Sequence, residues 1–269
     1  MKAWQIGLLL FCFSGATFAV MHQEEVSYKD GDVELKGYLF WDDAFTGKRP
    51  GVLVVHEWWG LNDYARKRAR MLAEQGYAAL AVDMYGDGKT ADNPTDASAL
   101  MLGVRNKPGE HSARFRAAMK FLQSQDEVDR DKIAAVGYCF FGGNTVLQMA
   151  RDGTVGLDGV ASFHGRLAVR DPNPPVPRIK ARILVCHGSE DVFVQEEEVE
   201  AFKKRMKDLE APLKFVAYKD AMHGFTNPEA NKAGEKFGIQ LVYNQEADQA
   251  SWGELSSFLE RLWQAPEAE

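Results

Sequence analysis

The sequence predicts an α/β fold, in which a mostly parallel central sheet is flanked by helices and preceded by an N-terminal β-hairpin. From residue 51 onward, short apolar runs alternate with amphipathic segments, which is the pattern of strands and helices in a parallel sheet. The runs 51–55 and 77–82 are almost wholly apolar, as central strands covered on both faces are. A chain of 269 residues, 45% hydrophobic and 26% charged, can bury one substantial core.

The β-hairpin is predicted over residues 25–41. Polar and apolar residues alternate in the segments 26–28 and 33–40, as they do in strands with one buried face. Asp30-Gly31 lies between the two segments, and Asp-Gly is a favoured hairpin turn.

The other elements follow in order along the chain. The predicted strands are 51–55, 77–82, 132–136, 157–163, 181–186 and 213–218. The predicted helices are 61–76, 97–104, 111–125, 144–151, 196–209 and 247–263. Residues 84–110 are polar and punctuated by Gly and Pro, so they are expected to pass over the sheet rather than to form a domain. Because the sequence shows no second core and no repeat, residues 20–269 are predicted to be a single domain.

Residues 1–19 have the features of a secretory signal peptide. Lys2 supplies a positive charge, residues 6–13 are apolar, and Thr17 and Ala19 are the small residues at positions −3 and −1 of a cleavage site after Ala19. The alternative is a retained N-terminal anchor, although the apolar stretch is too short to span a membrane. We expect the mature chain to be exported, with the periplasm as the simplest destination.

The composition also narrows the choice of partners. The net charge is −7 and no basic tract is present, which argues against a nucleic-acid partner. No three His and Cys residues have the spacing of metal ligands, so we expect no metal site. We expect a small-molecule substrate, no integral membrane span in the mature chain, and a monomer or a small homo-oligomer.

A cysteine lies where a predicted strand meets a predicted helix. Strand 132–136 leads into Gly137-Tyr138-Cys139, and glycines follow at positions 142 and 143. A strand that turns sharply into a helix, with a nucleophile at the tip, is the nucleophile elbow of α/β-hydrolases. The N-terminus of the following helix favours a thiolate at this position. The alternative is a buried thiol beside a tight strand–helix turn.

Two further polar residues follow later strands. Asp191 comes after strand 181–186, and His223 comes after strand 213–218. Alone, Asp191 could cap the next helix and His223 could be a turn residue. Together with Cys139 they give the chain order nucleophile, acid, base, which is the order found in α/β-hydrolases. We therefore predict an α/β-hydrolase fold with a Cys139–His223–Asp191 triad, in which His223 is the base and Asp191 orients it.

A tetrahedral intermediate also needs N–H donors for its oxyanion. One donor is predicted to be the backbone N–H of Phe140, the residue that follows the nucleophile. The second is predicted to come from the loop after strand 51–55, where the backbone N–H of Trp58 is the better candidate.

Aromatic residues and histidines lie near the same strand ends. Trp59, Tyr85 and Phe225 are expected to form the wall of an apolar substrate pocket together with Trp58, although aromatic residues are more often part of the core. His56 and His164 could also line the pocket, but histidines with a structural role are more common.

Five segments together resemble the dienelactone hydrolase family, over about residues 25–263. They are His56-Glu57-Trp-Trp-Gly60, Val82-Asp83-Met-Tyr-Gly86, Gly137-Tyr-Cys139, His187-Gly-Ser-Glu-Asp191 and His223-Gly-Phe225. The resemblance implies that a Cys–His–Asp triad hydrolyses a lactone or ester through an acyl-enzyme, without metal or cofactor. It also implies that Glu57 contacts the cysteine at rest and takes part in its activation.

Two departures from the family pattern bear on function. The family elbow runs Gly-x-Cys-x-Gly-Gly, whereas Phe140 and Phe141 both precede the glycines here. Either an extra residue rotates the helix by about 100°, or Phe141 replaces a glycine and crowds the strand–helix packing, and we expect a distorted oxyanion hole. Family members that bind the dienelactone carboxylate use arginines, and residues 225–228 contain none, so dienelactone is not assigned as the substrate.

Cys139 and Cys186 are not expected to form a disulfide. The strand 157–163 should lie between the strands that end at these two residues. Two strand spacings amount to roughly 9.5 Å, whereas a disulfide needs Cα atoms within about 7 Å.

Two hypotheses follow from the sequence. The first is an exported cysteine hydrolase that cleaves a small carboxylic ester or lactone through an acyl-enzyme intermediate. The second is a non-catalytic ligand-binding or thiol-sensing protein, which would keep the hydrolase fold with an altered nucleophile elbow.

Overall fold

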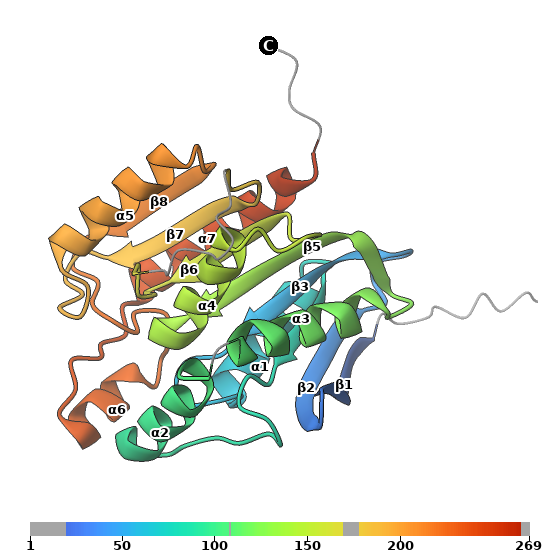
Figure 1. The fold of residues 1–269 in the computed structure, drawn as a ribbon, viewed down its shortest axis with the longest axis horizontal. Helices are drawn as coiled ribbons and strands as arrows, with labels where there is room; N and C mark the ends of the chain where they lie inside the picture. The colour runs from blue at the N-terminus through green and yellow to red at the C-terminus, as the bar shows by residue number, and fades with distance from the viewer. Residues whose placement is uncertain (1–19, 108, 169–177, 265–269) are drawn as a thin grey trace, which may run out of the picture.

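The computed structural model describes residues 20–107, 109–168 and 178–264, which form one sheet with helices on both faces (Figure 1). The predicted signal peptide at residues 1–19 lies outside the described residues. In the part of the chain that the structure describes, no helix is long and apolar enough to cross a membrane.

The sheet has eight strands in the order β1-β2-β4-β3-β5-β6-β7-β8. The strands are β1 (Met21–Asp30), β2 (Val33–Asp42), β3 (Arg49–Val55), β4 (Ala78–Val82), β5 (Val128–Tyr138), β6 (Gly159–Phe163), β7 (Arg182–Gly188) and β8 (Leu213–Tyr218). Strands β1 and β2 form the predicted antiparallel hairpin, and β2 pairs antiparallel with β4. The pairs from β4 through β3 to β8 are all parallel, which confirms the predicted α/β-hydrolase fold.

Two apolar layers hold the helices against the sheet. The helices are α1 (Asp63–Ala73), α2 (Pro94–Arg105), α3 (Glu110–Gln123), α4 (Cys139–Arg151), α5 (Glu196–Asp208), α6 (Ala230–Phe237) and α7 (Gln245–Leu262). Apolar residues of α1 and α7 belong to one buried cluster, and those of α3, α4 and α5 belong to the other.

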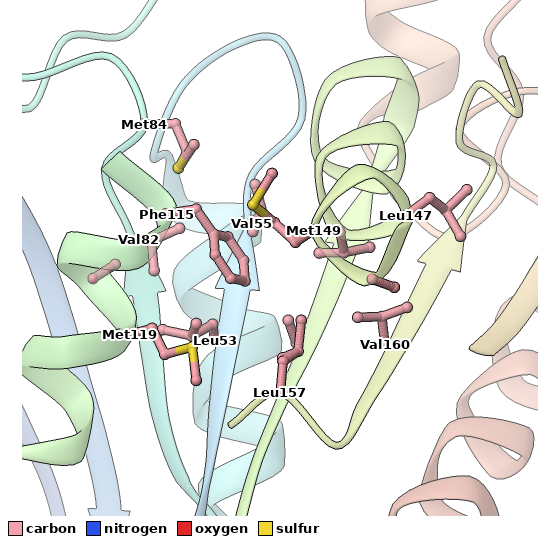
Figure 2. Close-up of a cluster of buried hydrophobic side chains, with 14 of the residues drawn as sticks. Leu53, Val55, Val82, Met84, Phe115, Met119, Leu147, Met149, Leu157 and Val160 are labelled. Carbon is pink, nitrogen blue, oxygen red and sulfur yellow. The ribbon is translucent and has the colours of Figure 1, made fainter. Parts of the chain in front are cut away.

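Strand β3 shows how the sheet separates these layers. Leu53 and Val55 lie in the cluster with α3 and α4, whereas Val52 and Val54 lie in the cluster with α1. Successive side chains of a strand point to opposite faces, so an unbroken apolar run serves both layers. Figure 2 shows the layer between the sheet and helices α3 and α4, where Phe115 of α3 packs beside Leu53 and Val55.

The parallel strands place their carboxyl ends at one edge of the sheet, where ligand sites of open α/β sheets collect. Helix α6 lies beyond this edge (Figure 1, lower left). Helix α6 is not among the helices predicted from the sequence, since its eight residues make only about two turns. The helix ends at Gly238, whose φ of 65° suits a glycine.

The strand order also answers the disulfide question. Strand β6 pairs with both β5 and β7, so it separates the strands that lead to Cys139 and Cys186. Both cysteines are free, as predicted. The thiol of Cys186 is buried and accepts a hydrogen bond from the hydroxyl of Tyr218 at 3.7 Å.

Candidate active site

Cys139 occupies a sharp turn between β5 and α4. Tyr138 is still extended, with φ −117° and ψ 145°, whereas Cys139 has a φ of 65°. A positive φ costs on the order of 1–2 kcal/mol for a residue with a Cβ atom, and such strain is common at functional sites. Gly137 makes the turn possible, because a Cβ there would lie 2.0 Å from the carbonyl oxygen of Gly142. The geometry is that of a nucleophile elbow.

Phe141 does not crowd the packing between strand and helix. Helix α4 runs unbroken from Cys139, and its close approaches to neighbouring backbone are made by Gly142 and Gly143. A Cβ on Gly142 would lie 2.6 Å from the carbonyl oxygen of His56. The ring of Phe141 is buried on the other side, with ring centroids 5.4 Å from His56 and 5.1 Å from Tyr85. The expected crowding is therefore wrong, because the glycines sit where close contact requires them.

The structure brings the three predicted triad residues together. His223 Nε2 lies 3.2 Å from Cys139 Sγ, and His223 Nδ1 lies 2.8 Å from Asp191 Oδ2. All three side chains are buried. The other carboxylate oxygen of Asp191 accepts a hydrogen bond from the backbone N–H of Phe193, which fixes the orientation of the carboxylate. A thiol, an imidazole and a carboxylate are thus joined in one hydrogen-bonded row.

The electrostatic surroundings of His223 favour its protonated form. Burial alone lowers its affinity for a proton, but the charges of Cys139 and Asp191 and the hydrogen bonds to them outweigh burial and raise the pKa of His223 to about 10. The ring of Phe140 stacks on the imidazole at 4.0 Å between centroids, and Phe193 contacts it edge-on at 5.5 Å. These rings hold the imidazole in a place with little access for water.

Glu57 lies in the same cavity wall as Cys139 and His223, and Asn227 is its hydrogen-bond partner. Its Oε2 accepts a hydrogen bond from Asn227 Nδ2 at 2.7 Å, and the described residues show no hydrogen bond between Glu57 and Cys139. Burial is the main cause that raises the pKa of Glu57 to about 7, because the Asn227 hydrogen bond and the charge of His223 only partly offset it. No local sequence pattern indicates Asn227, because the buried acid finds its donor 170 residues further along the chain.

The loop after β3 is held by two buried side chains. The backbone N–H of Met84 donates to His56 Nε2 at 3.3 Å, so Nδ1 carries the proton and donates to the carbonyl oxygen of Glu57 at 2.5 Å. Burial lowers the pKa of His56 to about 4, which keeps the ring neutral. The hydroxyl of Tyr85 donates to the carbonyl oxygen of Trp58 at 2.9 Å. Both carbonyls of this loop therefore have fixed directions.

A cavity of about 340 Å³ opens over the thiol. Its wall includes Cys139, His223, Glu57, Trp58, Trp59, Asn227, Ala230, Ala233 and Phe237. Helix α6 supplies the last three of these residues. The ring centroids of Phe237 and Trp59 are 6.0 Å apart. Trp58 and Trp59 thus face the cavity as expected.

Tyr85 and Phe225 do not belong to the residues that line this cavity. Tyr85 is buried behind the loop after β3, where it binds the Trp58 carbonyl. Phe225 is fully buried and packs against His164 and Tyr218, at 5.3 Å and 5.5 Å between ring centroids. Both aromatic residues support the site from within the core. Across the described ranges, no three His, Cys, Asp or Glu side chains are grouped so that they could hold a metal ion.

The fold and the site define the class of protein. A mostly parallel sheet whose nucleophile elbow faces an imidazole and a carboxylate from later strand ends is an α/β-hydrolase. The sequence model of the dienelactone hydrolase family matches residues 35–263, so the chain belongs to this family. It is therefore a hydrolase of the ester or lactone type.

Relatives and solved structures agree with this assignment. A putative carboxymethylenebutenolidase from Saccharolobus solfataricus is 26% identical over 280 residues, which cover 89% of this chain and 99% of the relative. The solved structure named m3DLH has 38% identity and a TM-score of 0.84, covering 91% of this chain and 99% of its own. A dienelactone hydrolase-like promiscuous phosphotriesterase from metagenomic libraries has 35% identity and a TM-score of 0.80, covering 90% and 98% of the two chains.

Proposed function

We propose that the protein hydrolyses a small carboxylic ester or lactone through a Cys139–His223–Asp191 triad and an acyl-enzyme intermediate. The observation that supports this most directly is the position of His223, which contacts both Cys139 Sγ and Asp191 at the base of a cavity. Thiol, base and orienting acid in one row are the arrangement that nucleophilic catalysis requires.

The proposed reaction has two halves. The thiolate of Cys139 attacks the carbonyl carbon, and the tetrahedral intermediate expels the alcohol as imidazolium His223 gives the leaving oxygen its proton. A thioester on Cys139 remains. Water then attacks the thioester while His223 takes a proton from it, and the acid is released with the thiolate restored. Asp191 keeps Nδ1 of His223 protonated, so that Nε2 faces the reacting atoms.

The proposed oxyanion donors are the backbone N–H groups of Phe140 and Trp58. The direction of the Glu57 carbonyl supports the second donor. That carbonyl points at His56, and in a trans peptide the N–H of Trp58 points the opposite way. The hydrogen bond to the carbonyl also polarises the peptide, which strengthens its N–H as a donor.

We propose that Glu57 favours the ion pair between thiolate and imidazolium. The charges of Glu57 and His223 act on each other, since His223 is one of the groups that lower the pKa of Glu57. By the same interaction an ionised Glu57 stabilises protonated His223, and a protonated His223 stabilises the thiolate of Cys139. Asn227 holds the Glu57 carboxylate in the cavity wall for this purpose.

The cavity favours esters with an apolar or aromatic group. Trp58, Trp59 and Phe237 supply adjoining flat apolar surface in the cavity wall, and a volume of about 340 Å³ suits a small substrate. One relative with 35% identity is described as a promiscuous phosphotriesterase. The panel of test substrates should therefore contain a p-nitrophenyl phosphotriester beside p-nitrophenyl carboxylic esters.

Hydrolysis of p-nitrophenyl acetate by the purified protein tests this proposal. We expect turnover that prior treatment with iodoacetamide abolishes, and we expect Cys139→Ala to reduce it by at least about 10³-fold. Turnover at the wild-type rate in Cys139→Ala would refute the assignment. A thiol that iodoacetamide alkylates readily, in a protein that hydrolyses none of the panel, would favour the thiol-sensing or ligand-binding alternative.

We also propose that residues 1–19 direct export to the periplasm and are removed after Ala19. The positive charge at Lys2, the apolar stretch 6–13 and the small residues Thr17 and Ala19 support this. Mass spectrometry of the protein from a periplasmic extract should find Val20 as the N-terminal residue. A chain that retains its first residues in the membrane fraction would contradict the proposal.

A further inference from the structure

A row of buried polar groups starts at the backbone of the nucleophile. The backbone N–H of Cys139 donates to His164 Nδ1 at 3.1 Å, and His164 Nε2 lies 2.8 Å from Thr226 Oγ1. His164 and Thr226 are 0% and 1% exposed, so neither has water as an alternative partner. His164 directly follows β6, and Thr226 lies three residues after His223. One imidazole thus connects the elbow to the loop that bears the base.

The row continues into the core between α1 and α7. Thr226 Oγ1 lies 2.6 Å from the hydroxyl of Tyr64, and Arg68 donates to the Thr226 carbonyl at 2.6 Å. Arg68 also forms an ion pair with Asp248 of α7. The loop with Thr226 is therefore anchored through both its side chain and its backbone.

The hydrogen bonds define the state of His164. A backbone N–H can only donate, so Nδ1 of His164 must accept, and the proton lies on Nε2, which donates to Thr226 Oγ1. Burial, together with the positive charges of His223 and Arg68, holds the pKa of His164 well below its usual range. The ring stays neutral, and its lone pair on Nδ1 remains available to Cys139.

We propose that His164 is a positioning residue for the thiol–imidazole pair, since it binds the amide of Cys139 on one side and, through Thr226, the loop of His223 on the other. This inference rests on the proposed triad. Cys139 and His164 both have a positive φ, of 65° and 39°, so two strained backbone positions are linked by this one hydrogen bond. The ring of His164 also contacts that of His223 edge-on, at 5.1 Å between centroids.

Loss of either hydrogen bond of His164 should disturb the alignment of Cys139 Sγ with His223 Nε2. Loss of the bond at Nδ1 frees the amide of Cys139 and lets the elbow relax from its left-handed conformation. Loss of the bond at Nε2 lets the loop with Thr226 and His223 shift relative to β6. A displacement of about 1 Å between reacting groups can cost on the order of 10²-fold in rate. Substrate contacts in the cavity are not changed, so the effect is expected in kcat rather than in KM.

Four variants test the two halves of the bridge. Thr226→Val keeps the shape and removes the hydroxyl, and Thr226→Ser restores it. His164→Asn keeps an acceptor near the position of Nδ1, whereas His164→Gln places an amide near the position of Nε2. A matched control is Thr145→Val, because Thr145 is equally buried and its hydroxyl also pairs with a histidine and a backbone carbonyl, those of His111 and Phe141, outside the bridge.

The expected results separate positioning from simple stabilisation. With p-nitrophenyl acetate we expect Thr226→Val and His164→Gln to lose at least about tenfold in kcat with KM within about twofold of wild type. We expect Thr226→Ser to retain more activity than Thr226→Val, and His164→Asn to retain more than His164→Gln. The pH profile of Cys139 alkylation by iodoacetamide should shift in the impaired variants and not in Thr145→Val, even where all variants lose thermal stability.

Other outcomes overturn the inference or isolate it. If folded Thr226→Val and His164→Gln keep the wild-type kcat and alkylation profile, His164 has no positioning role, while the hydrolase assignment stands. If the wild type hydrolyses nothing but the alkylation profile shifts in these variants, the bridge is real and the proposed function fails. Should His164→Gln fail to fold, the pair Thr226→Val and Thr226→Ser decides.

Discussion

At the scale of single residues, Glu57 and His223 both bind protons more tightly than their free side chains, for opposite reasons. Glu57 does so because burial disfavours its charge. His223 does so because two neighbouring negative groups favour its charge. The site therefore keeps a proton on the His223 imidazole, while the Glu57 carboxyl titrates close to neutral pH. The two groups can be tested separately, Glu57 through the pH dependence of stability and His223 through its own titration.

Replacement of Glu57 should change the pH dependence of stability. The pKa of Glu57 is about 7 in the folded protein against 4.5 for the free group, so the folded state binds the proton more tightly. This contribution is fully present below pH 4.5, and it is lost as the pH rises through 7, at a cost of about 3 kcal/mol. We expect Glu57→Gln to lose this decrease. Urea unfolding of both proteins at about pH 5 and about pH 8 measures the difference, and parallel decreases in both would contradict the burial of an ionisable Glu57.

Removal of the thiol should lower the pKa of His223. The charge of Cys139 is the largest of the causes that raise it to about 10, so Cys139→Ala should bring it down by more than about one pH unit, with Asp191 still in place. NMR titration of the His223 ring in both proteins reports this change. Cys186→Ala is the control, because that thiol is buried and bonded to Tyr218. An unchanged titration in Cys139→Ala would show that the two groups do not form an ion pair.

The grouping of Cys139, Asp191 and His223 could be predicted from the sequence, but the residues that support this group could not. Cys139, Asp191 and His223 each follow a strand, and parallel strands bring their ends together in any such fold. Asn227 and His164 act on groups that are distant in the sequence. Asn227 binds the side chain of Glu57, and His164 binds the backbone amide of Cys139. Local pattern contains no information on such pairs.

At the scale of elements, α4 explains why an additional phenylalanine is tolerated in the elbow. The helix places Gly142 and Gly143 against neighbouring backbone and turns Phe141 toward His56 and Tyr85. The expectation that Phe141 crowds the strand–helix packing assumed that the glycines must occupy fixed positions relative to the nucleophile. The helix instead meets the sheet with a register in which the later glycines make the contacts.

Deletion of Phe141 should therefore inactivate the protein rather than improve it. Removal of one residue rotates the rest of α4 by about 100° and takes Gly142 and Gly143 away from the backbone that they approach. We expect a loss of at least about 10²-fold in kcat/KM and a lower Tm. Esterase assays with thermal unfolding of the deletion variant and of Phe141→Leu, which keeps an apolar side chain in place, measure both effects. Higher activity after deletion would show that the elbow is impaired as built.

Helix α6 should select among substrates. Phe237 and Trp59 lie side by side in the cavity wall, with ring centroids 6.0 Å apart, so an aromatic acyl group that packs against these rings gains contacts that an acetyl group does not. We expect Phe237→Ala to raise KM for p-nitrophenyl benzoate about three- to tenfold and to leave KM for p-nitrophenyl acetate nearly unchanged. Phe237→Leu should lie between the two. Equal effects on both esters would place the acyl group elsewhere in the cavity.

At the scale of the whole molecule, the sheet followed from the sequence more completely than the site did. Apolar runs such as β3 and β4 serve two buried layers at once, and this requirement leaves a strong trace in sequence. The strand order then separated Cys139 from Cys186, as expected. Helix α6 leaves a weaker trace, because it has only eight residues and buries only the small residues Ala230 and Gly234.

In the proposed reaction Cys139 forms an acyl-enzyme, and His223 drives its formation and breakdown. Quenching the reaction with p-nitrophenyl acetate within the first turnover, followed by peptide mass spectrometry, tests it most directly. We predict one acetyl group on the peptide with Cys139, which disappears once substrate is exhausted, and which accumulates more slowly in His223→Ala. Turnover with no acetyl group on Cys139, or an acetyl group that stays after the substrate is gone, would contradict the account.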